Sequence, residues 1–143
     1  MAAGVTVIDD FAHNPDKIAA TLATLRAHPG RLFIMFQPHG FGPLTKMGEE
    51  LAEAIAAGMA PDDRLYLPDP VYQGGTVDKA RGSDWLADAV RAHDKQAEHI
   101  AERPRIGDAL LADGVGVTGA VLMCCAVLLR TSPVFGLDLW LVR

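Results

Sequence analysis

The chain alternates between two patterns of hydrophobic and polar positions. Short runs of consecutive apolar or β-branched residues are typical of strands buried in a parallel sheet, and longer stretches with apolar residues three or four apart are typical of helices. The runs predict strands at 5–8, 32–36 and 63–67, and the longer stretches predict helices at 15–26 and 44–57. This order predicts an α/β fold with three Rossmann-like layers and a mostly parallel sheet of about five to six strands.

The second half of the chain continues the alternation less regularly. A long irregular segment at 68–78 comes first, and a segment of this length is usually functional or mobile. The elements expected after it are a helix at 83–91 capped by Ser83, a weak strand at 96–101, a helix from Pro104 through residue 112, a strand at 115–118, a buried helix in the apolar run 120–129, and an edge strand within 133–142. We expect one domain over residues 1–143.

Composition excludes several classes of protein. The 143 residues carry a net charge of −5, and no basic patch predicts binding to nucleic acid or to an anionic membrane. The apolar run near the C-terminus is too short and too interrupted by glycine for a membrane span, and the N-terminus does not have the pattern of a signal peptide. Two adjacent cysteines, Cys124 and Cys125, predict reduced thiols in a cytoplasmic protein.

The candidate chemistry gathers where the first predicted strand ends. Asp9, Asp10 and His13 follow the strand, and Asn14 and Pro15 are suited to cap and start the next helix. In open α/β sheets ligands bind at the carboxyl ends of the strands. The same residues are also common in turns that only cap a helix, so a functional site and a capping turn are about equally favoured on physical grounds. The remaining acids and histidines, among them Asp62, Asp63, His28, His93 and His99, are interpreted as surface groups in contact with solvent.

Three segments resemble the C-terminal domain of the Mur ligases. Residues 9–15, DDFAHNP, resemble the signature that opens this domain, residues 36–39, FQPH, resemble its second motif, and residues 69–75 resemble the loop after its third strand. The resemblance extends over roughly residues 5–120. It implies an ATP-dependent amide ligase of peptidoglycan precursor synthesis, in which this domain closes over a central ATPase domain that binds most of the ATP and Mg²⁺. The substrates implied are a UDP-MurNAc-type sugar nucleotide and an amino acid or peptide.

The resemblance also implies roles for individual residues. Carried over by position, His13 and Asp10 would be catalytic, and Asp10, Phe11, His13 and Asn14 would face the nucleotide. His39, Lys46 and Tyr72 would contact the amine substrate. No metal ligand is implied in this domain.

The chain departs from the family pattern in three places. Gly40 and Pro43 stand where ligases that take a free amino acid have arginines, which argues against free L-alanine and leaves a peptide or another acceptor open. No phosphate-binding G-x-x-x-x-G-K-[ST] motif is present, so we expect no catalysis by this domain alone. Residues 121–143 form a divergent hydrophobic tail, through which a homodimer could assemble. The alternative hypothesis is a freestanding, non-catalytic binding or scaffolding module derived from this domain.

Overall fold

One parallel sheet organises the chain. The computed structural model describes residues 5–27, 30–71, 74–113, 119–124 and 140–141. Within this part the strands are β1 (Val5–Asp10), β2 (Arg31–Phe36), β3 (Arg64–Leu67), β4 (Gln96–His99), β5 (Gly119–Cys124) and β6 (Trp140–Leu141), and the helices are α1 (Pro15–Leu25), α2 (Phe41–Gly58), α3 (Ser83–Arg91) and α4 (Arg103–Ala112). The strand order is β4-β3-β2-β5-β1-β6, and every pair is parallel.

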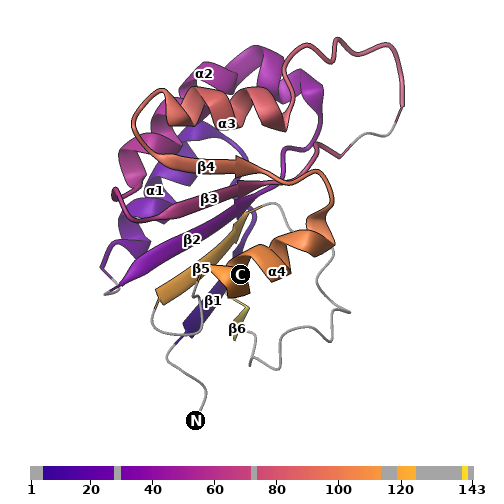
Figure 1. Ribbon diagram of the computed structural model, residues 1–143. Helices are drawn as coiled ribbons and strands as arrows, with labels where there is room; N and C mark the ends of the chain where they lie inside the picture. The colour runs from indigo at the N-terminus through magenta and orange to yellow at the C-terminus, as the bar shows by residue number, and fades with distance from the viewer. Residues whose placement is uncertain (1–4, 28–29, 72–73, 114–118, 125–139, 142–143) are drawn as a thin grey trace.

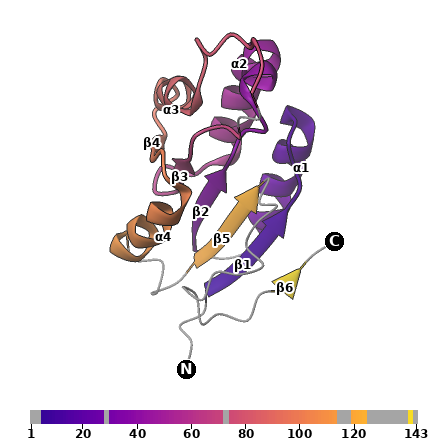
Figure 2. The same ribbon diagram turned by 90° about the vertical axis from the view of Figure 1, so that its right-hand side faces the viewer.

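The helices cover the two faces of the sheet unequally. Helices α1, α2 and α3 lie side by side on one face, and α4 lies on the other (Figures 1 and 2). Five consecutive buried residues, 32–36, form most of β2, as expected for a central strand covered on both sides. Leu22 of α1 and Leu51 of α2 are almost completely buried against this sheet. The three-layer α/β prediction is therefore confirmed.

Two predicted helix starts need correction. Helix α2 begins at Phe41 rather than at residue 44 and has a kink at Met47, whose φ of −134° is not helical. Ser83 does not cap α3, because Gly82 occupies the cap position and Ser83 is the first helical residue. The Ser83 hydroxyl instead donates a hydrogen bond of 2.5 Å to the carbonyl oxygen of Pro68. It therefore ties the helix to the end of β3.

The prediction for the last third of the sheet is partly wrong. The strand predicted at 115–118 lies outside the described residues, and the strand described next in the chain is β5. It pairs with both β1 and β2, so the first part of the apolar run predicted as a helix is a central strand. Residues 125–129 lie outside the described part. The predicted edge strand is confirmed by β6, which pairs with β1.

The prediction that Asp63 is a surface charge is also wrong. It is completely buried and accepts hydrogen bonds from the backbone N–H groups of Leu32 (2.8 Å) and Ala60 (2.7 Å). Arg26 adds an ion pair of 2.6 Å. A buried carboxylate needs such partners, and here they join the end of α1 to the starts of β2 and β3.

No helix in the described part of the chain is long and apolar enough to cross a membrane.

Candidate functional site

The loop from β1 to α1 places the first motif at the carboxyl end of the sheet. Asn14 caps α1, because its side-chain oxygen accepts a hydrogen bond of 2.9 Å from the backbone N–H of Lys17, and Pro15 starts the helix. Ala12 is buried and anchors the loop. The predicted cap is confirmed, and Asn14 has a structural role whatever else it contacts.

Asp10 is oriented by the helix that follows it. The hydroxyl of Thr21, in the middle of α1, donates a hydrogen bond of 2.5 Å to Oδ2 of Asp10. The carboxylate is half-buried at the end of β1. A carboxylate fixed by one hydrogen bond and still partly open to solvent can accept further donors from a ligand.

Three rings from two loops form an aromatic cluster, consisting of Phe11, His13 and His39. The Phe11 ring centroid lies 5.4 Å from that of His13 and 5.5 Å from that of His39, the latter in an edge-on arrangement. Phe11 is 58% exposed, although a large apolar side chain is usually covered. The cluster therefore brings residues of the first two motifs together on an open surface.

The imidazole of His13 has a defined hydrogen bond. Its Nδ1 lies 3.0 Å from the carbonyl oxygen of Phe11. The carbonyl can only accept, so the arrangement fits a ring whose protonated Nδ1 donates, which leaves Nε2 as the acceptor. A neutral imidazole of this tautomer can take a proton from a neighbouring group.

The charges beside this cluster are perturbed by burial. Burial raises the pKa of Asp9 above its ordinary value, the positive charge of Arg103 opposes this, and the negative charge of Asp10 adds to it. Burial lowers the pKa of Arg103, and Asp9 opposes that change. Perturbed acids and bases in one place are typical of functional sites.

A second set of contacts holds the loops after β2 and β3 together. Gln37 accepts a hydrogen bond of 3.1 Å from Nη1 of Arg103 and donates one of 3.0 Å to the carbonyl oxygen of Asp69. The backbone N–H of Val71 donates to the carbonyl oxygen of Pro38 at 3.0 Å. The second and third motifs are therefore joined to each other and to the start of α4.

The predicted site residues differ in how they are placed. The structure brings Phe11, His13 and His39 together, with Asp10 at the end of the adjacent strand. Lys46 is exposed on α2 and has no hydrogen bond or ion pair with the described residues, and Tyr72 lies outside them. Their contact with a substrate stays a prediction.

Sequence reasoning missed several polar residues at this edge of the sheet. His99 was predicted to contact only solvent, but its Nε2 lies 2.6 Å from Oδ1 of Asp69 and its side chain is 30% exposed. Arg103 and Gln37 were not identified at all, although Gln37 belongs to the FQPH segment. His93 is exposed as expected, and His28 lies outside the described residues. Within the described part of the chain, no three His, Cys, Asp or Glu side chains gather as a metal site requires.

Comparison with known proteins identifies the family. The family model described as "Mur ligase, glutamate ligase domain" matches residues 1–126. The chain belongs to the Mur ligase family. It is 36% identical over 126 residues to the UDP-N-acetylmuramate–L-alanine ligase of Streptomyces coelicolor, a match that covers 80% of this chain and 27% of that protein. For the enzyme of the same name from Myxococcus xanthus the identity is 35%, and the match covers 92% of this chain and 30% of the relative. The chain thus spans about a third or less of these relatives and corresponds to a Mur ligase C-terminal domain.

Solved structures agree on the fold. A domain of a UDP-N-acetylmuramate:L-alanyl-γ-D-glutamyl-diaminopimelate ligase assigned in Haemophilus ducreyi has a TM-score of 0.55 and 22% identity, with 85% of this chain and 80% of that chain covered. E. coli FolC in complex with ADP has a TM-score of 0.55 and 19% identity, with 80% of this chain and 24% of that chain covered. At these identities the likeness supports the Mur ligase C-domain fold and nothing finer.

Proposed function

We propose that this Mur ligase domain closes over the reaction centre of an ATP-dependent amide ligase that acts on a UDP-N-acetylmuramate substrate. The observation that carries the proposal is the aromatic cluster, in which two family motifs meet beside the half-buried carboxylates of Asp9 and Asp10. The central ATPase domain would be supplied by the same polypeptide or by a partner, and would bind most of the ATP and Mg²⁺.

Each residue of the cluster has a proposed role in amide formation. ATP phosphorylates the sugar-linked carboxylate, and the amine then attacks the acyl carbon. The new C–N bond forms, the C–O bond to phosphate breaks, and the nitrogen loses a proton. Nε2 of His13 is the acceptor for that proton, because Nδ1 is engaged by the Phe11 carbonyl. Asp10, fixed by Thr21, faces the nucleotide, and Phe11 and His39 exclude water around the amine.

The acceptor amine is the least defined part of the proposal. The relatives are named L-alanine ligases, but Gly40 has a φ of +135°, a conformation that an arginine at this position would adopt only under strain. Pro43 lies in the first turn of α2. The backbone at Gly40 therefore disfavours arginine, and the arginine of the family pattern is replaced by proline at Pro43. We infer that the acceptor is a peptide, or an amine whose carboxylate is bound elsewhere.

The test is a phosphate-release assay on the complete ligase that contains this domain, with ATP, UDP-N-acetylmuramate and either L-alanine or an alanine-containing dipeptide. We expect His13→Ala and Asp10→Ala to lower kcat by about 10²-fold or more. The unfolding midpoint is measured alongside, because Asp10→Ala also removes the acceptor of the Thr21 hydroxyl. His93→Ala, which removes an exposed histidine at the end of α3, is the matched control and should retain full activity.

Two outcomes would contradict the proposal. Full activity in His13→Ala and Asp10→Ala would overturn the assignment of the catalytic residues. No activity of the wild-type ligase with either acceptor would favour the alternative, a freestanding binding or scaffolding module that has lost catalysis. A dimer assembled through residues 121–143 would then be the next property to measure, by sedimentation equilibrium.

A further inference from the structure

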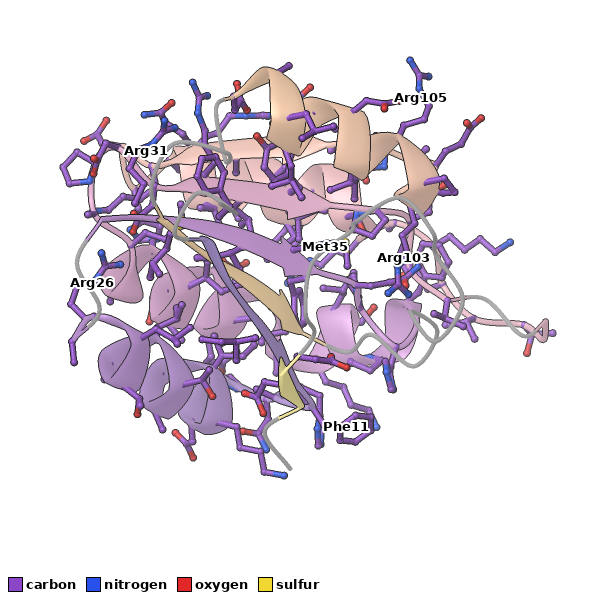
Figure 3. All side chains as sticks on the ribbon, turned by 90° about the horizontal axis from the view of Figure 1, so that it is seen from below. Phe11, Arg26, Arg31, Met35, Arg103 and Arg105 are labelled. Carbon is purple, nitrogen blue, oxygen red and sulfur yellow. The ribbon has the colours of Figure 1, made fainter. Side chains whose placement is uncertain are left out.

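Arg103 joins the start of α4 to the loop that follows β2, at the carboxyl ends of the strands. It is the first residue of α4, which among the described helices is the one on its face of the sheet. Its Nη1 donates to Gln37 at the end of β2, 66 residues earlier in the chain. Figure 3 shows Arg103 directed toward the carboxyl ends of the strands, whereas Arg105, two residues later, points away from the molecule.

The Gln37 side chain links Arg103 to the loop after β3. Its oxygen is held by Arg103, which leaves its Nε2 aimed at the carbonyl of Asp69. The Asp69 N–H in turn donates to the carbonyl of Ala101 at 3.2 Å, just before α4. Together with the bond from Val71 to Pro38, these contacts close a ring through three connections of the sheet.

This arrangement places part of a charged guanidinium group away from water. Nη2 of Arg103 is buried and has no hydrogen-bond partner in the described part of the chain. A buried donor without a partner lowers stability, and burial also disfavours the charge of the guanidinium. Nε of Arg64, at the start of β3, is also buried without a partner among the described residues, so the bond to Gln37 and the charge of Asp9 are what distinguish Arg103.

We propose that Arg103 is a positioning residue, which holds the Gln37 amide so that His39, two residues later, stays beside Phe11 in the aromatic cluster. The inference rests on the proposed function, because the substrate loop that it positions is the one assigned there to the amine. Arg103 itself need not touch the substrate. Its positive charge also opposes the rise in the pKa of Asp9 at the end of β1.

The first experiment measures the loop directly and needs no ligase activity. Amide hydrogen exchange of Val71, read by NMR on the 143-residue chain, reports the bond that joins the loops after β2 and β3. We expect Arg103→Met to speed this exchange about tenfold, because a hydrogen bond from a charged donor is lost. Gln37→Leu should do the same with Arg103 intact, and Arg103→Lys should restore part of the protection. Arg105→Met is the matched control and should exchange like the wild type.

The second experiment measures the consequence in the complete ligase. We expect Arg103→Met to raise KM for the amine about tenfold while KM for ATP changes less than about twofold, with partial rescue by Arg103→Lys. Unchanged exchange of Val71 in both Arg103→Met and Gln37→Leu would overturn the proposal. So would faster exchange with an unchanged KM for the amine. If the wild type shows no ligase activity, the proposed function fails, and the exchange of Val71 still decides whether Arg103 holds the loop.

Discussion

An acid and an arginine from a distant segment interact at each end of the sheet, but they form a direct ion pair at one end only. Each end pairs an acid with an arginine from a distant segment, Asp63 with Arg26 at the amino end and Asp9 with Arg103 at the carboxyl end. Asp63 is completely buried, and its oxygen lies 2.6 Å from Arg26. Asp9 and Arg103 interact through their charges, but no direct ion pair joins them in the described structure. Figure 3 shows the two ends well separated, with Arg26 at one and Arg103 at the other.

The difference lies in the hydrogen bonds that the two acids accept. Both oxygens of Asp63 accept hydrogen bonds, two of them from backbone N–H groups, so this end contributes to stability. Among the described residues, each end has one buried guanidinium nitrogen without a hydrogen-bond partner, Nε of Arg64 at the amino end and Nη2 of Arg103 at the carboxyl end. The ends differ in that the Asp9 carboxylate accepts no hydrogen bond from the described residues and Phe11 is 58% exposed. Incomplete satisfaction lowers stability and leaves groups available to a ligand. The contrast therefore separates an acid that stabilises the fold from an acid at the end of the sheet where the candidate site lies.

The largest effect is expected at the amino end. Asp63→Ala removes a buried acceptor from Leu32, Ala60 and Arg26, and should lower the free energy of unfolding by about 3 kcal/mol, because two backbone donors are left without partners. Urea denaturation measures the change. Asp62→Ala is the matched control, since its side chain is exposed, and should cost less than about 0.5 kcal/mol. Equal losses in both variants would contradict the distinction between the two acids.

A smaller effect is expected from Asn14, which caps α1 and for which a contact with the nucleotide stays a prediction. Asn14→Ala should lower the free energy of unfolding by about 1 kcal/mol, because α1 loses its cap. Asn14→Ser retains a capping oxygen and should restore most of the stability. If the amide also faces the nucleotide, Asn14→Ser should still raise KM for ATP in the complete ligase. A wild-type KM in Asn14→Ser would limit Asn14 to the cap.

Local patterns explain which elements the sequence predicts. The runs that became β1, β2 and β3 and the cap at Asn14 depend on neighbouring residues, so they are visible in the sequence. The run starting at Ala120 was predicted as a helix because a short apolar stretch suits a buried strand and a buried helix equally well. Its pairing with both β1 and β2 decides the matter, and that pairing is not written in the run itself.

In the candidate site, too, residues in local motifs could be predicted and residues with remote partners could not. The motifs around His13 and His39 could be found, because they resemble a family at fixed positions. Asp63 and Arg103 were missed because their partners are remote, 37 residues away for Arg26 and 66 for Gln37. An acid on a turn and an arginine at a helix start are ordinary surface residues until the fold brings such partners to them.

The smallest predicted effect has the opposite sign and tests the carboxyl end alone. Burial raises the pKa of Asp9 in the folded chain, whereas the unfolded chain has the ordinary value of about 4. The folded state thus binds the proton more tightly, so the contribution of Asp9 to stability falls as the pH rises from about 4 through the raised pKa. Asp9→Asn cannot ionise, and its stability relative to the wild type should increase over that range and then level off. Urea unfolding at a series of pH values measures it. In an Arg103→Met background, which lacks the opposing positive charge, the gain should be larger. A loss of stability in Asp9→Asn across the whole pH range would mean that Asp9 is as well satisfied as Asp63, and the contrast between the two ends of the sheet would fail.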